Sequence, residues 1–260
     1  MGNSKEFSKF LVIFIDVLGS KNRLKFDEQY RVNNIFHDEF DKHGESLSHV
    51  IYRRRIYSFS DCAYIFYDYK QGIEDNCKDL GKLLTVALCN CERIFLKLLS
   101  ERIVFRGGIT YGDAYVDENR ALFFGNAVNR TYTMESTEAI HPRILVDNFV
   151  AKKVIENIET VKYKSLANDS EFLPYIMAGL MPQMPLTGDG IIEKDLDGRY
   201  IYNYLHFPEN NFWVDGLYTS GQEFIKAIIK YCDVQVHDST EYKIIDKYLY
   251  LKRFCESKII

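Results

Sequence analysis

The sequence predicts an α+β fold with a ferredoxin-like βαββαβ core and added C-terminal strands and helices. Two observations support this prediction. A long apolar, β-branched run opens the chain, and two later strand-like runs, joined by a short turn, precede a helical repeat. We expect a single domain over residues 1–260, with its core at about 8–207 and a helical extension at about 208–260.

The first elements follow from the pattern of apolar residues. Residues 10–17 (FLVIFIDV) form a continuous apolar run, which predicts a central strand covered on both faces. A mixed polar stretch at about 27–47 predicts a helix. Residues 51–58 and 62–67 are strand-like, and the short link between them predicts a hairpin. Residues 75–100 predict a long helix, because their apolar side chains recur at i, i+3 and i+4.

The second half of the chain gives a weaker pattern. Residues 103–111 predict a strand, and a further hairpin is expected from two short runs that precede a helix starting near Gly125 or Asn126. We also expect the following elements: hairpin strands at 113–116 and 121–124, strands at 144–146 and 200–207, helices at 147–158, 219–232 and 241–254, and a loop at 180–189.

The composition is typical of a globular protein. Hydrophobic residues make up 47% of the chain, charged residues make up 27%, and the formal net charge is -4. A slightly acidic chain argues against general nucleic-acid binding. We expect no membrane span, because no run of about 18 apolar residues occurs. The six cysteines lack paired spacing, so we expect buried, reduced thiols in a cytoplasmic protein.

Two aspartates occupy positions that favour metal binding. Asp16 ends the first apolar strand, and Asp61 lies at the first hairpin. In a βαββαβ sheet the first and third strands are neighbours, so the two carboxylates can come together. Such an all-oxygen site suits Mg²⁺ or Mn²⁺. The alternative is that each aspartate only caps the turn beside it. We favour the metal site, because both aspartates lie on these two elements.

A short turn follows Asp16. Leu18, Gly19 and Ser20 lie between the first strand and the first predicted helix. Backbone N–H groups in such a turn can bind phosphate oxygens, helped by the helix dipole. One glycine is a weak signal by itself, and its position just after a possible metal ligand strengthens it.

Four motifs of this chain resemble those of class III nucleotidyl cyclases. They are FIDVLGS, SFSDCAYIF, FRGGITYGDA and FFGNAVNRTYTME, in the order and spacing of that family, and they cover roughly residues 10–135. Within the family the sequence is most similar to the bacterial pyrimidine (cytidylate or uridylate) cyclases of Pycsar antiphage defence systems. The sequence segments FSDCAYIFYD and RGGITYG indicate this subgroup.

The resemblance implies an activity and its partners. The expected reaction converts CTP or UTP to 3′,5′-cyclic CMP or cyclic UMP plus pyrophosphate, with two divalent ions, Mn²⁺ or Mg²⁺, as cofactors. It implies a homodimer whose active sites lie at the interface, and a functional link to an effector that the cyclic nucleotide activates. It also implies that Asp16 and Asp61 bind the metals and that the Val17 carbonyl faces one of them.

The resemblance assigns further residues to the substrate. The turn from Leu18 to Ser20 would hold the β- and γ-phosphates, and Asn129 would orient the ribose. Tyr57 stands where purine cyclases place the residue that reads the base, so a bulky phenol there favours a pyrimidine. In this family the metals and phosphates are held by one chain, while Tyr57, Asn129 and the catalytic arginine come from the other.

One position departs from the family pattern. The family places a transition-state arginine four residues after the asparagine, where this chain has Thr133. Arg130 is the nearest cation and Arg106 is a second one, so either could take the catalytic role. The departure keeps open a degenerate, cyclase-like nucleotide sensor, and a purine cyclase is a further alternative. A diguanylate cyclase is disfavoured, because its Gly-Gly-Asp/Glu-Glu-Phe hairpin is missing.

Overall fold

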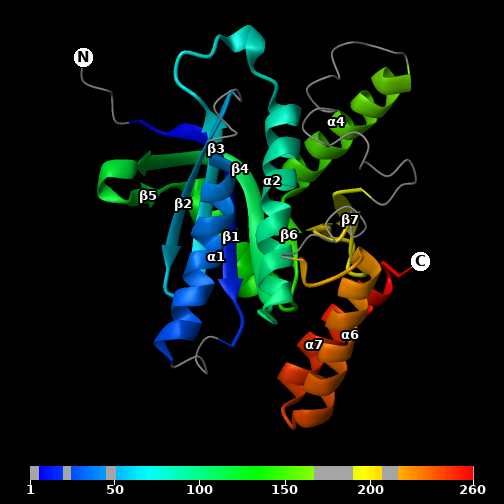
Figure 1. Cartoon of the computed structure of the whole chain (residues 1–260). Helices are drawn as coiled ribbons and strands as arrows, with labels where there is room; N and C mark the ends of the chain where they lie inside the picture. The colour runs from blue at the N-terminus through cyan, green and yellow to red at the C-terminus, as the bar shows by residue number, and fades with distance from the viewer. Residues whose placement is uncertain (1–5, 20–24, 45–50, 167–189, 207–215, 260) are drawn as a thin grey trace.

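The computed structural model describes residues 6–19, 25–44, 51–166, 190–206 and 216–259. Its strands form one mixed sheet in the order β2-β3-β1-β4-β6-β8-β7, and β5 pairs with β4 outside this path (Figure 1). The strands are β1 Ser8–Val17, β2 Tyr52–Phe59, β3 Cys62–Tyr69, β4 Phe105–Asp117, β5 Leu122–Phe124, β6 Ile144–Val146, β7 Ile192–Lys194 and β8 Tyr200–Tyr202. The helices are α1 Phe26–Gly44, α2 Leu80–Ser100, α3 Asn126–Thr133, α4 Asn148–Leu166, α6 Gly221–Asp238 and α7 Tyr242–Glu256.

The predicted α+β architecture is confirmed. The chain runs β1, α1, β2, β3, α2, β4, and β1 lies between β3 and β4, with antiparallel pairing on both sides. The apolar run at residues 10–17 is therefore the central strand that its pattern predicts. Leu11, Val12, Ile13 and Ile15 are fully buried. A strand with such residues on both faces needs cover on each side of the sheet.

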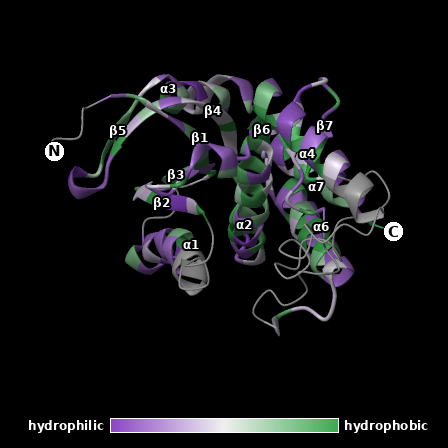
Figure 2. Cartoon of the chain, turned by 90° about the horizontal axis from the view of Figure 1, so that it is seen from above, coloured by the Kyte–Doolittle hydropathy of each residue, from purple (hydrophilic) through white to green (hydrophobic). Residues whose placement is uncertain are grey.

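Helices cover the two faces of the sheet unequally. Side chains alternate along β1, so Leu11 and Ile13 belong to the large core beneath α1, α2 and α4, while Phe10 and Val12 belong to a smaller cluster with α3. Figure 2 shows this sandwich, with α3 on one side of the strands and α1 and α2 on the other. Asp16 has the same parity as Val12 and therefore lies on the α3 face.

Several boundaries differ from the predicted ones. The α2 helix begins at Leu80 because the Asp79 carboxylate accepts a hydrogen bond from the Lys82 N–H at 3.0 Å, and a short 3₁₀ turn precedes it. β4 is one continuous strand where a break near Gly112 was predicted. β8 is shorter than predicted, and its neighbour β7 was not predicted at all. The predicted loop at 180–189 lies outside the described residues.

The C-terminal extension forms two helices that pack on the core. The α6 and α7 helices lie side by side at the β6 end of the sheet (Figure 1). Their buried side chains Cys232, Leu251 and Cys255 belong to the same cluster as the sheet. The Tyr231 hydroxyl donates to the Arg102 carbonyl at 3.3 Å, which ties α6 to the end of α2.

Two predictions from composition have different outcomes. No helix among the described residues is long and apolar enough to span a membrane. The prediction of buried thiols holds for Cys91, Cys232 and Cys255, whereas Cys77 is exposed. Cys77 lies in the short 3₁₀ turn before α2, which contributes no buried residue. The apolar pattern of the helix therefore does not extend to it.

Candidate active site

The sheet brings the two predicted carboxylates together. Asp16 on β1 lies directly opposite Cys62 on β3, which places it beside Asp61 in the preceding turn. The Val17 N–H donates to the Asp61 carbonyl oxygen at 3.0 Å, so the two chain segments are joined at this point. Ser60, in the same turn, has a φ of 56°. The expected adjacency of the first and third strands is thus observed, and both acids lie at one end of the sheet.

The Asp16 carboxylate is partly buried and surrounded by charge. Its side chain is 24% exposed. Burial raises the pKa of Asp16, the Arg106 guanidinium lowers it, and the nearby Asp61 carboxylate raises it again. A cation bound between the two carboxylates would relieve their mutual repulsion.

Arg106 is the cation nearest to Asp16 among the residues described. It lies directly opposite Asp16 in the β1–β4 ladder. Its Nε atom is 3.5 Å from Asp16 Oδ2 and 2.6 Å from Glu135 Oε1, and its Nη1 donates to the Ala139 carbonyl at 3.5 Å. Of the two arginines proposed from the sequence, Arg106 is therefore the one that lies beside the carboxylates of its own chain.

Glu135 is a site residue that the sequence reasoning missed. It is only 4% exposed and lies in a π-helical turn, Met134–Glu138, that follows α3. Its pKa is raised to about 7, chiefly by burial and also by the Asp16 carboxylate, against the opposing charge of Arg106. The only signal in the sequence was a glutamate in the motif TYTME, to which no role was assigned.

A glycine allows Glu135 to approach the sheet. A Cβ atom at Gly108 would lie 2.7 Å from Met134 Cβ and 2.8 Å from the Thr131 carbonyl oxygen. The helix can lie this close to β4 only because the strand has no side chain there. The Arg-Gly-Gly motif thus places a guanidinium at position 106 and a contact surface for the helix at position 108, two residues apart on one face of the strand.

The turn after Asp16 is described only in part. The Leu18 N–H donates to the Val104 carbonyl at 2.8 Å, so it is already engaged within the sheet. Gly19 has a φ of 77°, a conformation that favours glycine. Phosphate contacts from this turn would have to begin at Gly19. Ser20 lies outside the described residues.

Tyr57 lies on the same face of the sheet as Asp16. It is directly opposite Tyr64 on β3, which is itself opposite Phe14 on β1. The Tyr57 ring is 5.1 Å from the Phe123 ring, and its hydroxyl oxygen is buried with no hydrogen-bond partner among the described residues. Burial raises the pKa of Tyr57, and the Glu118 carboxylate adds to this. The hydroxyl is neutral and has an unused hydrogen-bonding capacity.

The residues predicted on α3 do not converge on Asp16. Asn129 and Thr133 are exposed, and the Thr133 hydroxyl donates to the Asn129 carbonyl at 2.9 Å. Arg130 forms a two-pronged ion pair with Glu138, which Arg199 also contacts at 3.3 Å. The catalytic role of Arg130 stays a prediction, and within one chain its guanidinium is bound to another carboxylate.

The donor set fits a hard divalent cation. Asp16 and Asp61 offer carboxylate oxygens, and Val17 can offer only its backbone carbonyl, because its side chain is a hydrocarbon. These are the oxygen ligands that Mg²⁺ and Mn²⁺ prefer. No group of three acidic, histidine or cysteine side chains suitable for a metal occurs among the described residues. Two carboxylates would therefore need water or substrate oxygens to complete the coordination, as Mg²⁺ commonly does.

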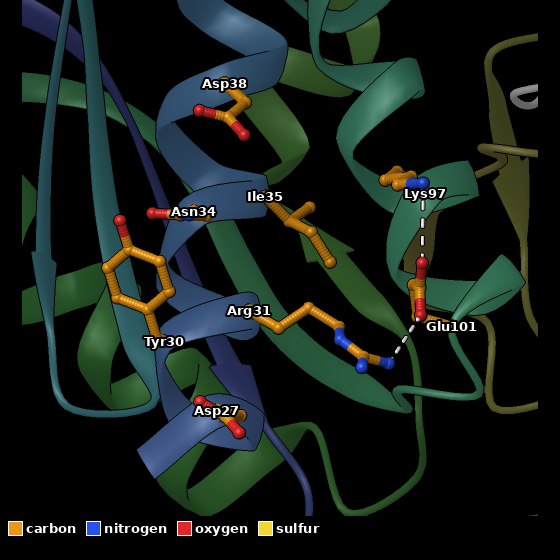
Figure 3. Close-up of a pocket in the computed structure, with 8 residues that line it drawn as sticks. All are labelled: Asp27, Tyr30, Arg31, Asn34, Ile35, Asp38, Lys97 and Glu101. Carbon is orange, nitrogen blue, oxygen red and sulfur yellow. Dashed lines mark hydrogen bonds and ion pairs between the residues drawn. The ribbon is translucent and has the colours of Figure 1, made fainter.

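A separate hollow of about 380 Å³ lies on the other face of the molecule, between α1 and α2. Figure 3 shows its lining, in which Arg31 and Lys97 both contact Glu101, at 3.1 and 3.4 Å. Because α1 and α2 cover the face opposite to Asp16, this hollow is not part of the carboxylate site.

Comparisons with known proteins give a likeness of fold alone. No protein-family model matches the sequence, and no curated protein matches it. One similar structure is the guanylyl cyclase domain of the RhoGC fusion protein from the aquatic fungus Blastocladiella emersonii in a non-canonical dimer, with a TM-score of 0.44 and 18% identity over 60% of this chain and 88% of that one. Another is the catalytic core of a rhodopsin-guanylyl cyclase with converted specificity in complex with ATPalphaS, with a TM-score of 0.42 and 16% identity over 58% and 83%.

Proposed function

We propose that this chain is a nucleotidyl cyclase of the class III type. The observation that carries the proposal is the juxtaposition of Asp16 and Asp61 at the ends of adjacent strands, with Arg106 beside them on the next strand. Two carboxylates can bind divalent ions, and a guanidinium beside them can bind the phosphate oxygens of a triphosphate. The reaction would close a nucleoside triphosphate into its 3′,5′-cyclic monophosphate and release pyrophosphate.

The residues of the site have separable tasks in this reaction. Asp16, Asp61 and the Val17 carbonyl would hold two divalent ions, which supply Lewis acidity at the ribose hydroxyl and at the triphosphate. The ribose 3′-oxygen forms a bond to the α-phosphorus, and the bond between that phosphorus and the bridging oxygen to the β-phosphate breaks. Arg106 can donate to the phosphate oxygens on which charge develops, because it already lies beside Asp16.

For the base we propose a pyrimidine, from CTP or UTP. Tyr57 supports this, since its aromatic ring fills space on the α3 face and its buried hydroxyl has no partner among the described residues. Such a group can donate to or accept from a base edge. The resemblance to Pycsar cyclases suggests in turn that the product is a cytoplasmic second messenger in antiphage defence, read by a separate effector.

We further propose that two copies of the chain form each active site. Asn129 is exposed on α3, and neither it nor Tyr57 has a described contact with Asp16 or Arg106. A homodimer with two-fold symmetry would present these residues to the metal site of the partner. Mixing Asp16→Asn with Asn129→Ala tests this, because each variant should be inactive alone while a mixed dimer regains one complete site. Two inactive variants that stay inactive after exchange of subunits would contradict a shared site.

The first experiment measures the reaction directly. Purified protein is incubated with Mn²⁺ and each of ATP, GTP, CTP and UTP, and the cyclic monophosphate is identified by mass. We expect cyclic CMP or cyclic UMP, and at least a 100-fold loss, of the order expected for removal of a key electrostatic group, in Asp16→Asn and Asp61→Asn. Asp113→Asn is the matched control, since that carboxylate pairs only with Lys9 at 3.0 Å among described residues.

Other outcomes separate the alternatives. A purine product would replace the pyrimidine assignment with a purine cyclase. Nucleotide binding without any product would favour a degenerate sensor, which the threonine at position 133 supports. Comparison of Tyr57→Phe with Tyr57→Ala assigns the base-reading role. Loss of discrimination in both variants points to the hydroxyl, loss only in Tyr57→Ala points to the ring, and unchanged preference in both excludes Tyr57.

A further inference from the structure

We propose that Lys247, on α7 of the C-terminal extension, is a phosphate-binding residue of the carboxylate site and that it acts with Arg106 on the triphosphate tail. The proposal rests on the proposed function for the identity of the ligand, a nucleoside triphosphate. Lys247 lies outside the motifs between residues 10 and 135, so the proposal gives the C-terminal extension a role in substrate binding.

The α7 helix is fixed against the segment that leads from α3 to β6. His141 in that segment contacts the Asp246 carboxylate through Nε2 at 3.0 Å, and its ring stacks on the Tyr250 ring at 4.7 Å. The Tyr250 hydroxyl donates to Asp195 at 2.7 Å. Three contacts over little more than one helical turn define where this part of α7 lies.

The same segment contacts the active-site arginine. The Ala139 carbonyl accepts from Arg106 Nη1 at 3.5 Å, two residues before His141. The segment therefore connects Arg106 on one side with Asp246 on the other. Lys247 immediately follows Asp246, so the fold places an ammonium group on a helix that packs against this segment.

The helical spacing turns Lys247 toward the protein. Lys247, Tyr250 and Phe254 occupy positions i, i+3 and i+7, which share one face of a helix. Tyr250 is 8% exposed, and Phe254 packs on the cluster that contains Met134 and Leu145. Lys247 continues this inward face by one turn and is itself only partly exposed.

Two charged groups of the carboxylate site act on the Lys247 ammonium. Burial and the Arg106 guanidinium lower the pKa of Lys247, while the Asp16 carboxylate raises it, so both groups lie within electrostatic reach of its ammonium. Lys243, one turn earlier on the helix, lowers it further. Arg106 already pairs with Asp16 and Glu135, so Lys247 adds a further cation whose charge a bound anion would balance.

Two other lysines of the extension have carboxylate partners. Lys252 binds Asp233 at 2.6 Å, and Lys258 binds Glu193. In the part of the chain that the structure describes, no carboxylate forms an ion pair with Lys247. A polyphosphate would supply the missing counter-charge, and an ammonium on a flexible stem is well suited to contact it as a point charge.

The test measures binding of inorganic tripolyphosphate by calorimetry in the presence of Mn²⁺, in the full-length protein. We expect Lys247→Gln to weaken tripolyphosphate binding about tenfold or more, and Lys247→Arg to retain most of it. Lys230→Gln on the exposed side of α6 is the charge-matched control and should bind as the wild type does. Thermal unfolding of each variant checks that the fold is retained.

Mn²⁺ titration without phosphate separates a ligand role from a local neutralising role. A lysine that only balances Asp16 would leave tripolyphosphate binding unchanged when replaced, and Mn²⁺ binding alone would become tighter. That result would overturn the proposal. If wild-type protein makes no cyclic nucleotide but Lys247→Gln still weakens tripolyphosphate binding, the reaction is wrong and the phosphate site stands. If cyclisation occurs and Lys247→Gln leaves both KM and the tripolyphosphate affinity unchanged, the proposed reaction stands and the phosphate-binding role of Lys247 is wrong.

Discussion

At the site, the absence of a side chain at one position is as important as the charged groups at others. Gly108 lacks the side chain that would otherwise separate β4 from the end of α3. Its neighbour Arg106 projects on the same face toward Asp16 and Glu135. The close approach of the helix is therefore a condition for bringing Glu135 to the two other charged groups.

We expect Gly108→Ala to destabilise the fold by about 1–3 kcal/mol, because the added methyl group would overlap Met134 and the Thr131 carbonyl. Gly112→Ala is the matched control on the same strand and face, since its Cβ would lie 3.5 Å from Ala127 Cβ, an ordinary contact. Urea unfolding followed by circular dichroism measures both. Equal stability of the two variants would contradict the close packing at Gly108.

The thiols should differ sharply in reactivity. Burial raises the pKa of Cys91 to about 12 and that of Cys232 to about 12, whereas Cys77 is exposed. Only the thiolate attacks a maleimide, so near pH 7.5 we expect rapid labelling of Cys77 in the native protein. The two buried thiols should react only after unfolding. Mass spectrometry of labelled peptides identifies the sites, and fast labelling of Cys91 would show that α2 is not packed as described.

At the scale of elements, the sheet edge beyond β4 depends on a buried arginine. Arg143 precedes β6, and its side chain is 6% exposed. It binds Asp195, which is 10% exposed, and Asp197 at 2.7 Å, so it ties β6 to the turn between β7 and β8. The Tyr250 hydroxyl also donates to Asp195, which extends the same network to α7.

Arg143→Met should therefore cost about 3 kcal/mol of stability, because it leaves the buried Asp195 carboxylate without a counter-charge, with hydrogen bonds only from the Tyr250 hydroxyl and the Leu196 N–H among the described residues. Adding Asp195→Asn should recover part of this loss. Lys153→Met, which breaks an exposed pair with Glu156, should change the free energy of unfolding by less than about 1 kcal/mol. An Arg143→Met protein as stable as the Lys153→Met control would exclude a structural role for the network.

Sequence reasoning was most successful where one periodicity extended over a whole element. The apolar run of β1 and the repeat of α2 predicted both elements, and the order of strands then placed Asp16 beside Asp61. Glu135 was missed because its position depends on a π-helical turn, which the 3.6-residue period does not predict. Lys247 was missed because only tertiary packing brings α7 near β4, more than a hundred residues earlier in the chain.

At the scale of the whole molecule, the β4–β5 hairpin extends from one side of the sheet (Figure 1), and exposed apolar side chains lie on it and beside it. Phe7 is 56% exposed and Phe124 is 47% exposed, and their rings lie 5.9 Å apart. Leu122, on the same short strand, is 43% exposed. A second copy of the chain could bury these side chains, and the proposed shared site needs such a copy.

We expect Phe124→Asp to shift the protein toward a monomer and to remove cyclase activity without unfolding it. A charge in a buried apolar contact disfavours association, while this side chain is already half exposed in the single chain. Sedimentation velocity at micromolar concentration gives the oligomeric state. Leu196→Asp, at a position 93% exposed, serves as the control. A fully active Phe124→Asp monomer would rule out the shared site.

The central position of β1 also has a consequence for biosynthesis. The two neighbours of β1 are β3 and β4, so its ladders cannot be completed before residue 114 has been added. During translation a strongly apolar segment therefore stays unpaired until β3 has been made and is paired on both edges only after β4, the situation in which nascent chains depend on chaperones. The α7 contacts come later still, from residues 246 to 254, so a nascent chain cannot assemble this corner of the site until those residues have been added.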